Sequence, residues 1–170
     1  QQAQLDTIFI QYRDSEPDAA IAAADRFIKA NPRHPYVDYA YYMKGLVNFQ
    51  RSNTLLDRLA PSDRDKTDTG TARQSYNDFA ELVRKFPDSR YAKDARQRMQ
   101  FLHNSLAAYE VNVASYYLKR GAYVAAVNRA TYVLETYART PSTASALSIM
   151  TEAYVNMGMP QLATDSLRVL

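Results

Sequence analysis

The stretch YYLKRGAYVAAVNRATYVLETYA, residues 116–138, contains the pattern that decides the fold. Both of its halves have helical periodicity, and a single glycine, Gly121, separates them. A residue without Cβ accepts the left-handed conformation of a tight turn, so we predict two helices joined at Gly121. The second of them carries one apolar stripe with i, i+3, i+4 spacing, made of Tyr123, Ala126, Val127, Ala130, Val133, Leu134 and Tyr137.

The arrangement around Gly121 occurs a second time near the end of the chain. An aromatic residue, a glycine and two small or apolar residues follow one another at equal spacing in both places. Self-similarity of this kind is typical of repeat proteins. The two matching sets are Tyr117, Gly121, Ala126 and Ala130, and Tyr154, Gly158, Ala163 and Leu167.

A second pattern repeats in the first half of the chain and ends in a proline. The two together correspond to the halves of a tetratricopeptide (TPR) repeat, in which helix A ends at a turn, helix B packs antiparallel on it through a small residue, and proline stops helix B. We therefore predict an all-α TPR solenoid, a right-handed superhelix of antiparallel helix pairs. The sets ending in proline are Ala20, Ala24, Phe27 and Pro32, and Ser75, Phe79, Leu82 and Pro87.

The repeats divide the chain into one predicted domain, 1–170, with a long polar loop at 52–70. A span without glycine or proline predicts one long helix at 89–120. The first helix has no upstream partner and the last apolar pattern looks interrupted, so we expect a chain trimmed at both ends. The approximate repeats are 1–34, 35–88, 89–140 and 141–170, and the expected helices are 3–13, 17–30, 36–51, 71–86, 89–120, 122–138, 142–157 and 159–170.

The composition excludes several classes of function. The chain has no cysteine, which excludes disulfides, thiolate metal sites and cysteine catalysis. Its formal net charge of +3 is too small, and its charges too interspersed, to indicate nucleic-acid binding. Its apolar runs are shorter than the roughly 18–20 residues of a spanning helix.

The sequence offers little for catalysis or for a cofactor. Of two histidines, His34 lies in the proline-bounded turn NPRHPY, where we expect a structural role, and His103 lies mid-helix without a second ligand at metal-binding spacing. The aspartates of 62–68 lack the glycine and glutamate of a calcium loop. Phosphate-loop, hydrolase and metalloprotease motifs are absent. We predict a protein that is not an enzyme and that holds no metal or cofactor.

Two features favour binding over catalysis. The run YVDYAYYMKGL places tyrosines on several sides of one helix, and tyrosine suits sites where one edge of the ring is wet. Tyr36, Tyr39 and Tyr42 are candidates for a peptide groove, although packing between repeats would explain them equally. The stretch 84–98, RKFPDSRYAKDARQR, is locally basic, which fits either a solvated helix face or a surface for acidic partners.

Four segments of the sequence resemble a known family. YAYYMKGL, SDRD, FPDSRYAKDARQRM and VASYYLKRGAYVAAVNRA are similar to the BamD (ComL/YfiO) family of outer-membrane assembly lipoproteins, and the likeness runs along the whole chain. The resemblance implies a fragment covering about repeats two to five of a five-repeat scaffold. It also implies an outer-membrane location on the periplasmic face, through an N-terminal lipid anchor that this chain lacks.

The resemblance further implies partners. They are the membrane-proximal POTRA domain of the insertase BamA, the lipoproteins BamC and BamE, and unfolded outer-membrane protein clients. Arg129 occupies the arginine of the family's N-R pair, on the face that docks on BamA. Tyr132, Arg139 and Glu152 are candidates from the same neighbourhood, and Tyr36, Tyr39 and Tyr42 match the client groove in residue type only.

Other classes of function share the periodicity and stay open on the residues alone. A generic TPR co-chaperone that binds peptides in another compartment would show the same helical pattern. An enzyme accessory domain or a nucleic-acid binder fits less well, because the sequence lacks an acid–base constellation and a concentrated basic patch.

Overall fold

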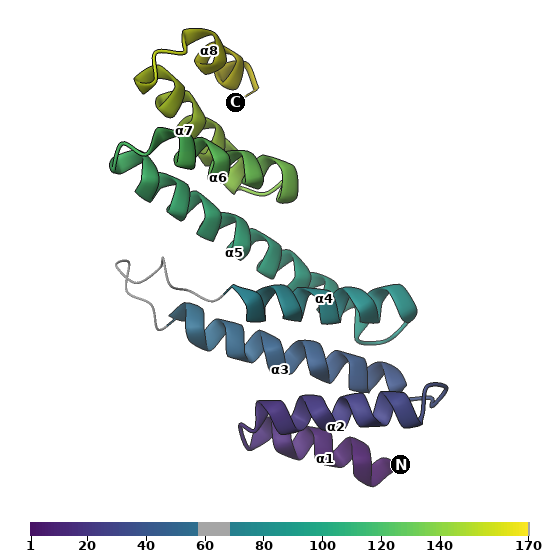
Figure 1. Cartoon of the computed structure of the whole chain (residues 1–170). Coiled ribbons are helices and arrows are strands. Elements are labelled where there is room, and N and C mark those ends of the chain that lie inside the picture. Colours follow the sequence, from purple (N-terminus) through teal and green to yellow (C-terminus); the bar gives the residue numbers. More distant parts are fainter. Residues whose placement is uncertain (58–68, 170) are drawn as a thin grey trace. The chain divides into compact units, whose positions relative to one another are not determined.

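Few glycines and prolines interrupt the sequence, and the structure accordingly consists of consecutive helices (Figure 1). The computed structural model describes residues 1–57 and 69–169. Over these residues the all-α repeat prediction is confirmed, and each predicted repeat range contains two consecutive helices. The helices are α1 (Gln2–Arg13), α2 (Pro17–Ala30), α3 (Val37–Asp57), α4 (Gly70–Lys85), α5 (Ala92–Lys119), α6 (Tyr123–Thr136), α7 (Ser142–Asn156) and α8 (Pro160–Val169).

The chain divides into two compact units, Gln1–Leu102 and His103–Leu170, called unit 1 and unit 2 below. The sequence predicts one solenoid domain, whereas the boundary between these units falls inside α5. The superhelical path over both units stays a prediction. Each unit is described by itself.

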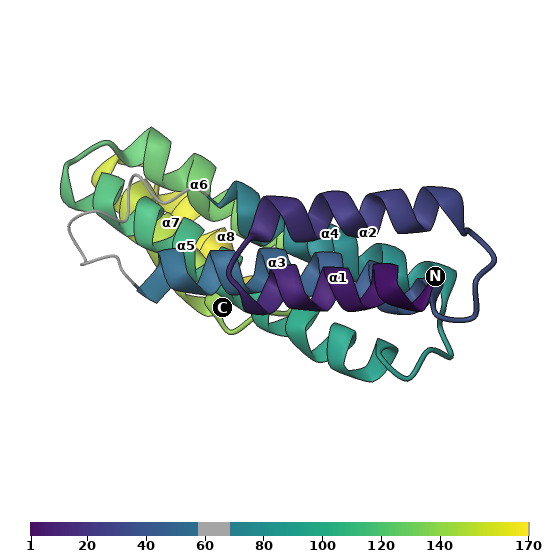
Figure 2. The same ribbon diagram turned by 90° about the horizontal axis from the view of Figure 1, so that it is seen from below.

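In unit 1, α1 packs on α2, α2 packs on α3 and α3 packs on α4, and α1 also contacts α3. Figure 2 shows α1 and α2 side by side, as in Figure 1. The apolar stripes of these helices meet in a core in which Ile8, Phe27 and Met43 are almost fully buried. Burying side chains of this size supplies most of the driving force for such a fold.

Small residues allow the paired helices to approach closely. Ala20 on α2, Ser75 on α4 and Ala126 on α6 are each 0% exposed. Between α3 and α4 the approach is closer still, because Gly45 lies against the ring of Phe79. Ser75 Oγ donates a hydrogen bond to the Gly45 carbonyl at 2.9 Å. The sequence analysis identified Ser75 and Phe79 but not Gly45.

Left-handed turns join the helices within three of the repeats. Gly121 and Gly158 have φ of +73° and +70°, which confirms both predicted glycine turns. Ser15 joins α1 to α2 with φ of 61°, so here the chain adopts the same conformation without a glycine. Arg139, between α6 and α7, has φ of 64°. Residues with a Cβ are strained in this region of φ and ψ.

We expect Gly121→Ala to lower the free energy of unfolding by about 1 kcal/mol, because alanine is strained at positive φ. Open space surrounds Gly121, since the nearest atom to an added Cβ is 4.0 Å away, so the effect is conformational and not steric. Ser15→Gly is the matched control and should stabilise the chain slightly. Urea unfolding of both variants checks the prediction, and equal signs for the two changes would contradict it.

Two boundaries of the sequence-based map are wrong by more than two residues. Residues 52–57, predicted as loop, continue α3, because serine, asparagine and threonine are only moderately unfavourable in a helix. The rest of the predicted 52–70 loop lies mostly outside the described residues, and Gly70 already begins α4. The long helix begins at Ala92 and not at 89, because Ser89 takes part in a turn in which its Oγ accepts from the Tyr91 N–H at 3.2 Å.

Candidate peptide groove and docking surface

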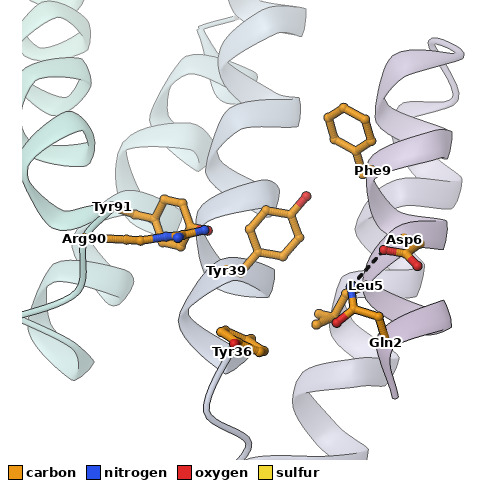
Figure 3. Close-up of a pocket in the computed structure, with 8 residues that line it drawn as sticks. All are labelled: Gln2, Leu5, Asp6, Phe9, Tyr36, Tyr39, Arg90 and Tyr91. Carbon is orange, nitrogen blue, oxygen red and sulfur yellow. Dashed lines mark hydrogen bonds between the residues drawn. The ribbon is translucent and has the colours of Figure 1, made fainter.

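A groove of about 380 Å³ opens in unit 1 (Figure 3). Three segments line it. The first turns of α1 supply four residues, the start of α3 and the residue directly before it supply two tyrosines, and the turn before α5 supplies an arginine and a tyrosine. The lining residues are Gln2, Leu5, Asp6, Phe9, Tyr36, Tyr39, Arg90 and Tyr91.

The α1 wall follows from helical spacing. Residues three and four apart lie on one face of a helix, so Gln2, Leu5, Asp6 and Phe9 all face the groove. Leu5 is buried and continues the core into the wall, whereas the Phe9 side chain is 48% exposed. A half-exposed aromatic ring beside an open groove is a contact surface available to a ligand.

The opposite wall is aromatic. Tyr36, directly before α3, is 54% exposed, and Tyr39 points towards α1 in Figure 3. The Tyr39 and Tyr91 rings lie 5.8 Å apart, and the Arg90 guanidinium lies 4.8 Å from the centre of the Tyr91 ring. Such rings offer flat apolar faces together with hydroxyl groups that form hydrogen bonds.

The groove carries one acidic and one basic side chain. Asp6 lies on α1, where its Oδ1 accepts a hydrogen bond from Gln2 Nε2 at 2.9 Å, and Arg90 lies with Tyr91. Burial raises the pKa of the Tyr39 hydroxyl, and the nearby Tyr91 and Asp6 raise it further, against an opposing effect of Arg90. Tyr39 therefore stays protonated at neutral pH, as a donor and an acceptor at the groove surface.

The structure places two of the three predicted groove tyrosines in this groove, Tyr36 and Tyr39. Tyr42 is not among the residues that line it. Its ring stacks on Tyr91 at 4.7 Å, and its hydroxyl donates to Asp94 Oδ2 at 2.7 Å. Tyr42 lies one turn after Tyr39 on the same helix. It contacts the groove residue Tyr91 but does not itself line the groove.

The environment of Tyr42 predicts an alkaline loss of stability. Burial, together with the hydrogen bond to Asp94, raises the pKa of Tyr42 from 10.0 to about 12. From about pH 10 to about pH 12 the unfolded chain releases this proton and the folded chain keeps it, so the free energy of unfolding falls as pH rises. Tyr42→Phe should make this fall shallower, which urea unfolding at several alkaline pH values measures. Tyr116→Phe is the control, and equal slopes in wild type and Tyr42→Phe would contradict the prediction.

The predicted docking residues come from three consecutive segments of unit 2. Arg129 and Tyr132 lie one turn apart on α6, Arg139 forms the turn after α6, and Glu152 lies on α7. Arg129, Arg139 and Glu152 are exposed, and Tyr132 is half-buried with its ring 5.8 Å from Tyr137.

Arg129 has a partner within its own unit. Its Nη1 lies 3.0 Å from Glu110 Oε2, and the Glu110 side chain is 2% exposed whereas that of Arg129 is 46% exposed. The sequence analysis expected this arginine to pair with a partner protein and missed the glutamate on α5. A guanidinium has five N–H donors in a fork, so one edge can neutralise Glu110 while the rest faces outward.

The basic stretch 84–98 is largely engaged with its own unit. Lys85 pairs with Glu81 at 2.7 Å, and Arg98 pairs with Asp94 at 2.6 Å. Arg90, which the sequence analysis treated as part of this patch, instead lines the groove. The sequence contained a signal for the role of Arg90. The dipeptide Arg90-Tyr91 lies in the turn between α4 and α5, and it places a cation beside an aromatic ring.

His34 has the expected structural role. Its Nδ1 accepts a hydrogen bond from the Tyr36 N–H at 3.1 Å, and its ring meets Phe27 edge-on at 5.2 Å. His103 lies 5.2 Å from the Tyr137 ring.

Over the described ranges, three or more carboxylates or histidines nowhere gather in a way that could hold a metal ion. Within the same ranges, every helix is too short or too polar to cross a membrane.

Comparisons with known proteins agree with the motifs of the sequence. A model of the YfiO family, described as outer membrane lipoprotein, matches residues 1–169. Three curated relatives are each named outer membrane protein assembly factor BamD. The one from Neisseria meningitidis serogroup A is 46% identical over 99% of this chain and 63% of its own length. Those from Xylella fastidiosa and Vibrio cholerae are 39% and 35% identical, over 100% and 94% of this chain and 58% and 66% of their own lengths.

The chain thus spans less than two thirds of the length of these relatives. They are named as assembly factors, in agreement with the prediction of a protein that is not an enzyme. The match extends over almost every residue, including the repeats that form the groove and the helices that carry the candidate docking residues. The chain therefore belongs to the YfiO family of outer membrane lipoproteins, and the assembly factors named BamD are its relatives.

Proposed function

We propose that this chain is the helical-repeat scaffold of an outer membrane protein assembly factor on the periplasmic face of the outer membrane. Unit 1 binds an extended segment of an unfolded client in its groove, and unit 2 docks on the membrane-proximal POTRA domain of BamA. BamC and BamE are further partners in the same assembly. The relatives named BamD support the assembly role, and the groove with its aromatic wall is the observation that carries client binding.

The chemistry of such clients fits the groove. Strands of outer-membrane barrels alternate apolar and polar residues over about ten residues and carry aromatic girdles at both ends. Phe9, Tyr36 and Tyr39 offer apolar faces to every second side chain of an extended peptide. The Tyr39 hydroxyl and the Arg90 guanidinium offer hydrogen bonds to its backbone carbonyls.

We expect a peptide of about ten residues that alternates aromatic and polar side chains to bind wild type, and Phe9→Ala or Tyr36→Ala to weaken it about fivefold to tenfold. Both side chains are half-exposed, so their removal costs little stability. Fluorescence anisotropy of the labelled peptide measures the affinity. Tyr116→Ala, which removes an exposed tyrosine of unit 2, is the matched control. Equal affinities of wild type and both groove variants would overturn the groove assignment.

Arg139 gives a sharper test of docking than Arg129 does. Because Arg139 is exposed and has φ of 64°, Arg139→Gly removes the side chain and relieves backbone strain at once. The variant should therefore fold at least as well as wild type and bind the POTRA domain about threefold to tenfold more weakly. Ser15→Gly makes the same kind of change in unit 1 and should leave docking unchanged. Calorimetric titration with the POTRA domain measures the affinities of both variants. Unaltered binding by Arg139→Gly would show that the turn after α6 is not part of the interface.

A further inference from the structure

Tyr91 is held in the groove wall in part by Tyr42, a residue that does not line the groove. Its ring stacks on Tyr42 with an interplanar angle of 17°, and it also contacts Tyr39 and Arg90. Tyr91 lies in the turn before α5, outside any helix, so its backbone alone does not fix the ring. The stack on Tyr42 supplies that restraint from α3.

Tyr42 is itself fixed on two sides. Its ring lies 6.0 Å from that of Phe79, which is fully buried in the core between α3 and α4. Its hydroxyl donates to Asp94 Oδ2 at 2.7 Å, and the same oxygen accepts from Arg98 Nε at 2.6 Å. Hydrogen bonds to a carboxylate are stronger than those between neutral groups, so the hydroxyl is anchored firmly.

Arg98 completes the support. Its guanidinium lies 4.7 Å from the centre of the Phe49 ring, and Phe49 contacts Phe79 and Phe101. A continuous set of contacts within unit 1 therefore leads from the core to the groove wall. The set consists of Phe49, Arg98, Asp94, Tyr42 and Tyr91.

We propose that Tyr42 and Asp94 are positioning residues that fix the Tyr91 ring, and with it the Arg90 guanidinium, in the shape that binds peptide. This inference rests on the proposed client groove. A wall that is rigid before binding lowers the entropy lost when the ligand is bound, so the support increases affinity without touching the peptide.

A double-mutant cycle on the whole chain tests the proposal with the same labelled ten-residue peptide. We expect Tyr91→Ala to weaken binding about tenfold and Tyr42→Leu about threefold to fivefold. In the Tyr91→Ala background, Tyr42→Leu should cause no further loss, because the ring that it positions is gone. Tyr42→Phe, which keeps the stack but loses the hydrogen bond to Asp94, should restore only part of the affinity that Tyr42→Leu loses.

Tyr41→Leu controls for general destabilisation. Tyr41 is buried on the same helix, its ring lies 5.6 Å from Phe86, and its hydroxyl accepts from Lys85 Nζ at 2.6 Å, so it matches Tyr42 in type but not in position. Its replacement should lower the free energy of unfolding and leave peptide binding unchanged. Additive losses in the cycle, or an equal loss of affinity in Tyr41→Leu, would overturn the positioning role. Unchanged binding in Phe9→Ala and Tyr36→Ala would instead overturn the groove itself.

Discussion

Gly45→Ala is expected to lower the free energy of unfolding by about 2–3 kcal/mol, the upper part of the range for an overpacked core. A Cβ at this position would lie 2.5 Å from Phe79 Cδ1 and 2.6 Å from Cε1, and Phe79 is fully buried. The ring cannot move away without disturbing its contacts with Tyr42 and Phe49. Urea unfolding followed by circular dichroism measures the loss.

The steric origin of this effect can be isolated by making room for the new methyl group. Phe79→Leu shortens the side chain that the Cβ meets and should itself be destabilising, because it leaves a cavity. In that background Gly45→Ala should cost much less than it does in wild type, since residues in contact are not additive. Full additivity of the two changes would show that the loss comes from elsewhere.

Arg129→Glu is expected to cost about 2–4 kcal/mol of stability without any partner present. The change leaves Glu110, 2% exposed, without its guanidinium and places a second carboxylate beside it. The effect stays below that of a fully buried pair because the Arg129 side chain is 46% exposed. Thermal and urea unfolding of the isolated chain give the measurement.

A second substitution separates the buried charge from other effects of the variant. In a Glu110→Gln background the buried position is neutral, so Arg129→Glu should there cost less than about 1 kcal/mol. A cost equal to that in wild type would contradict the assignment. With this expected loss of stability, weaker POTRA binding by Arg129→Glu alone would not be a measure of contact between Arg129 and the proposed partner.

The sequence was sufficient to predict features that depend on local chemistry. Gly121 and Gly158 stand in turns whose positive φ favours glycine, and Ala20, Ser75 and Ala126 stand where only small side chains allow helices to meet. These requirements recur at equivalent positions of several repeats, so they leave a periodic signal. Ser15 shows the limit of that signal. It has the same left-handed conformation, but a serine in the sequence does not predict such a turn.

Features that depend on contacts between distant residues could not be predicted in the same way. The Arg129–Glu110 pair joins α6 to α5, and the Tyr42–Asp94 hydrogen bond joins α3 to α5. The pattern of tyrosines alone could not distinguish Tyr42, which supports the groove wall, from Tyr39, which forms it. The groove also includes Phe9, whose role depends on which face of α1 lies next to α3.

The ion pair between Arg129 and Glu110 affects how sequence conservation in this family should be interpreted. Natural selection for a stable fold preserves an arginine that neutralises a buried carboxylate, whether or not a second protein ever touches it. Conservation of that arginine among relatives is therefore poor evidence of partner binding. Arg139 is the more informative position, because its exposed side chain sits on a strained backbone where stability alone favours glycine, so an arginine retained there by many relatives would indicate selection for a contact.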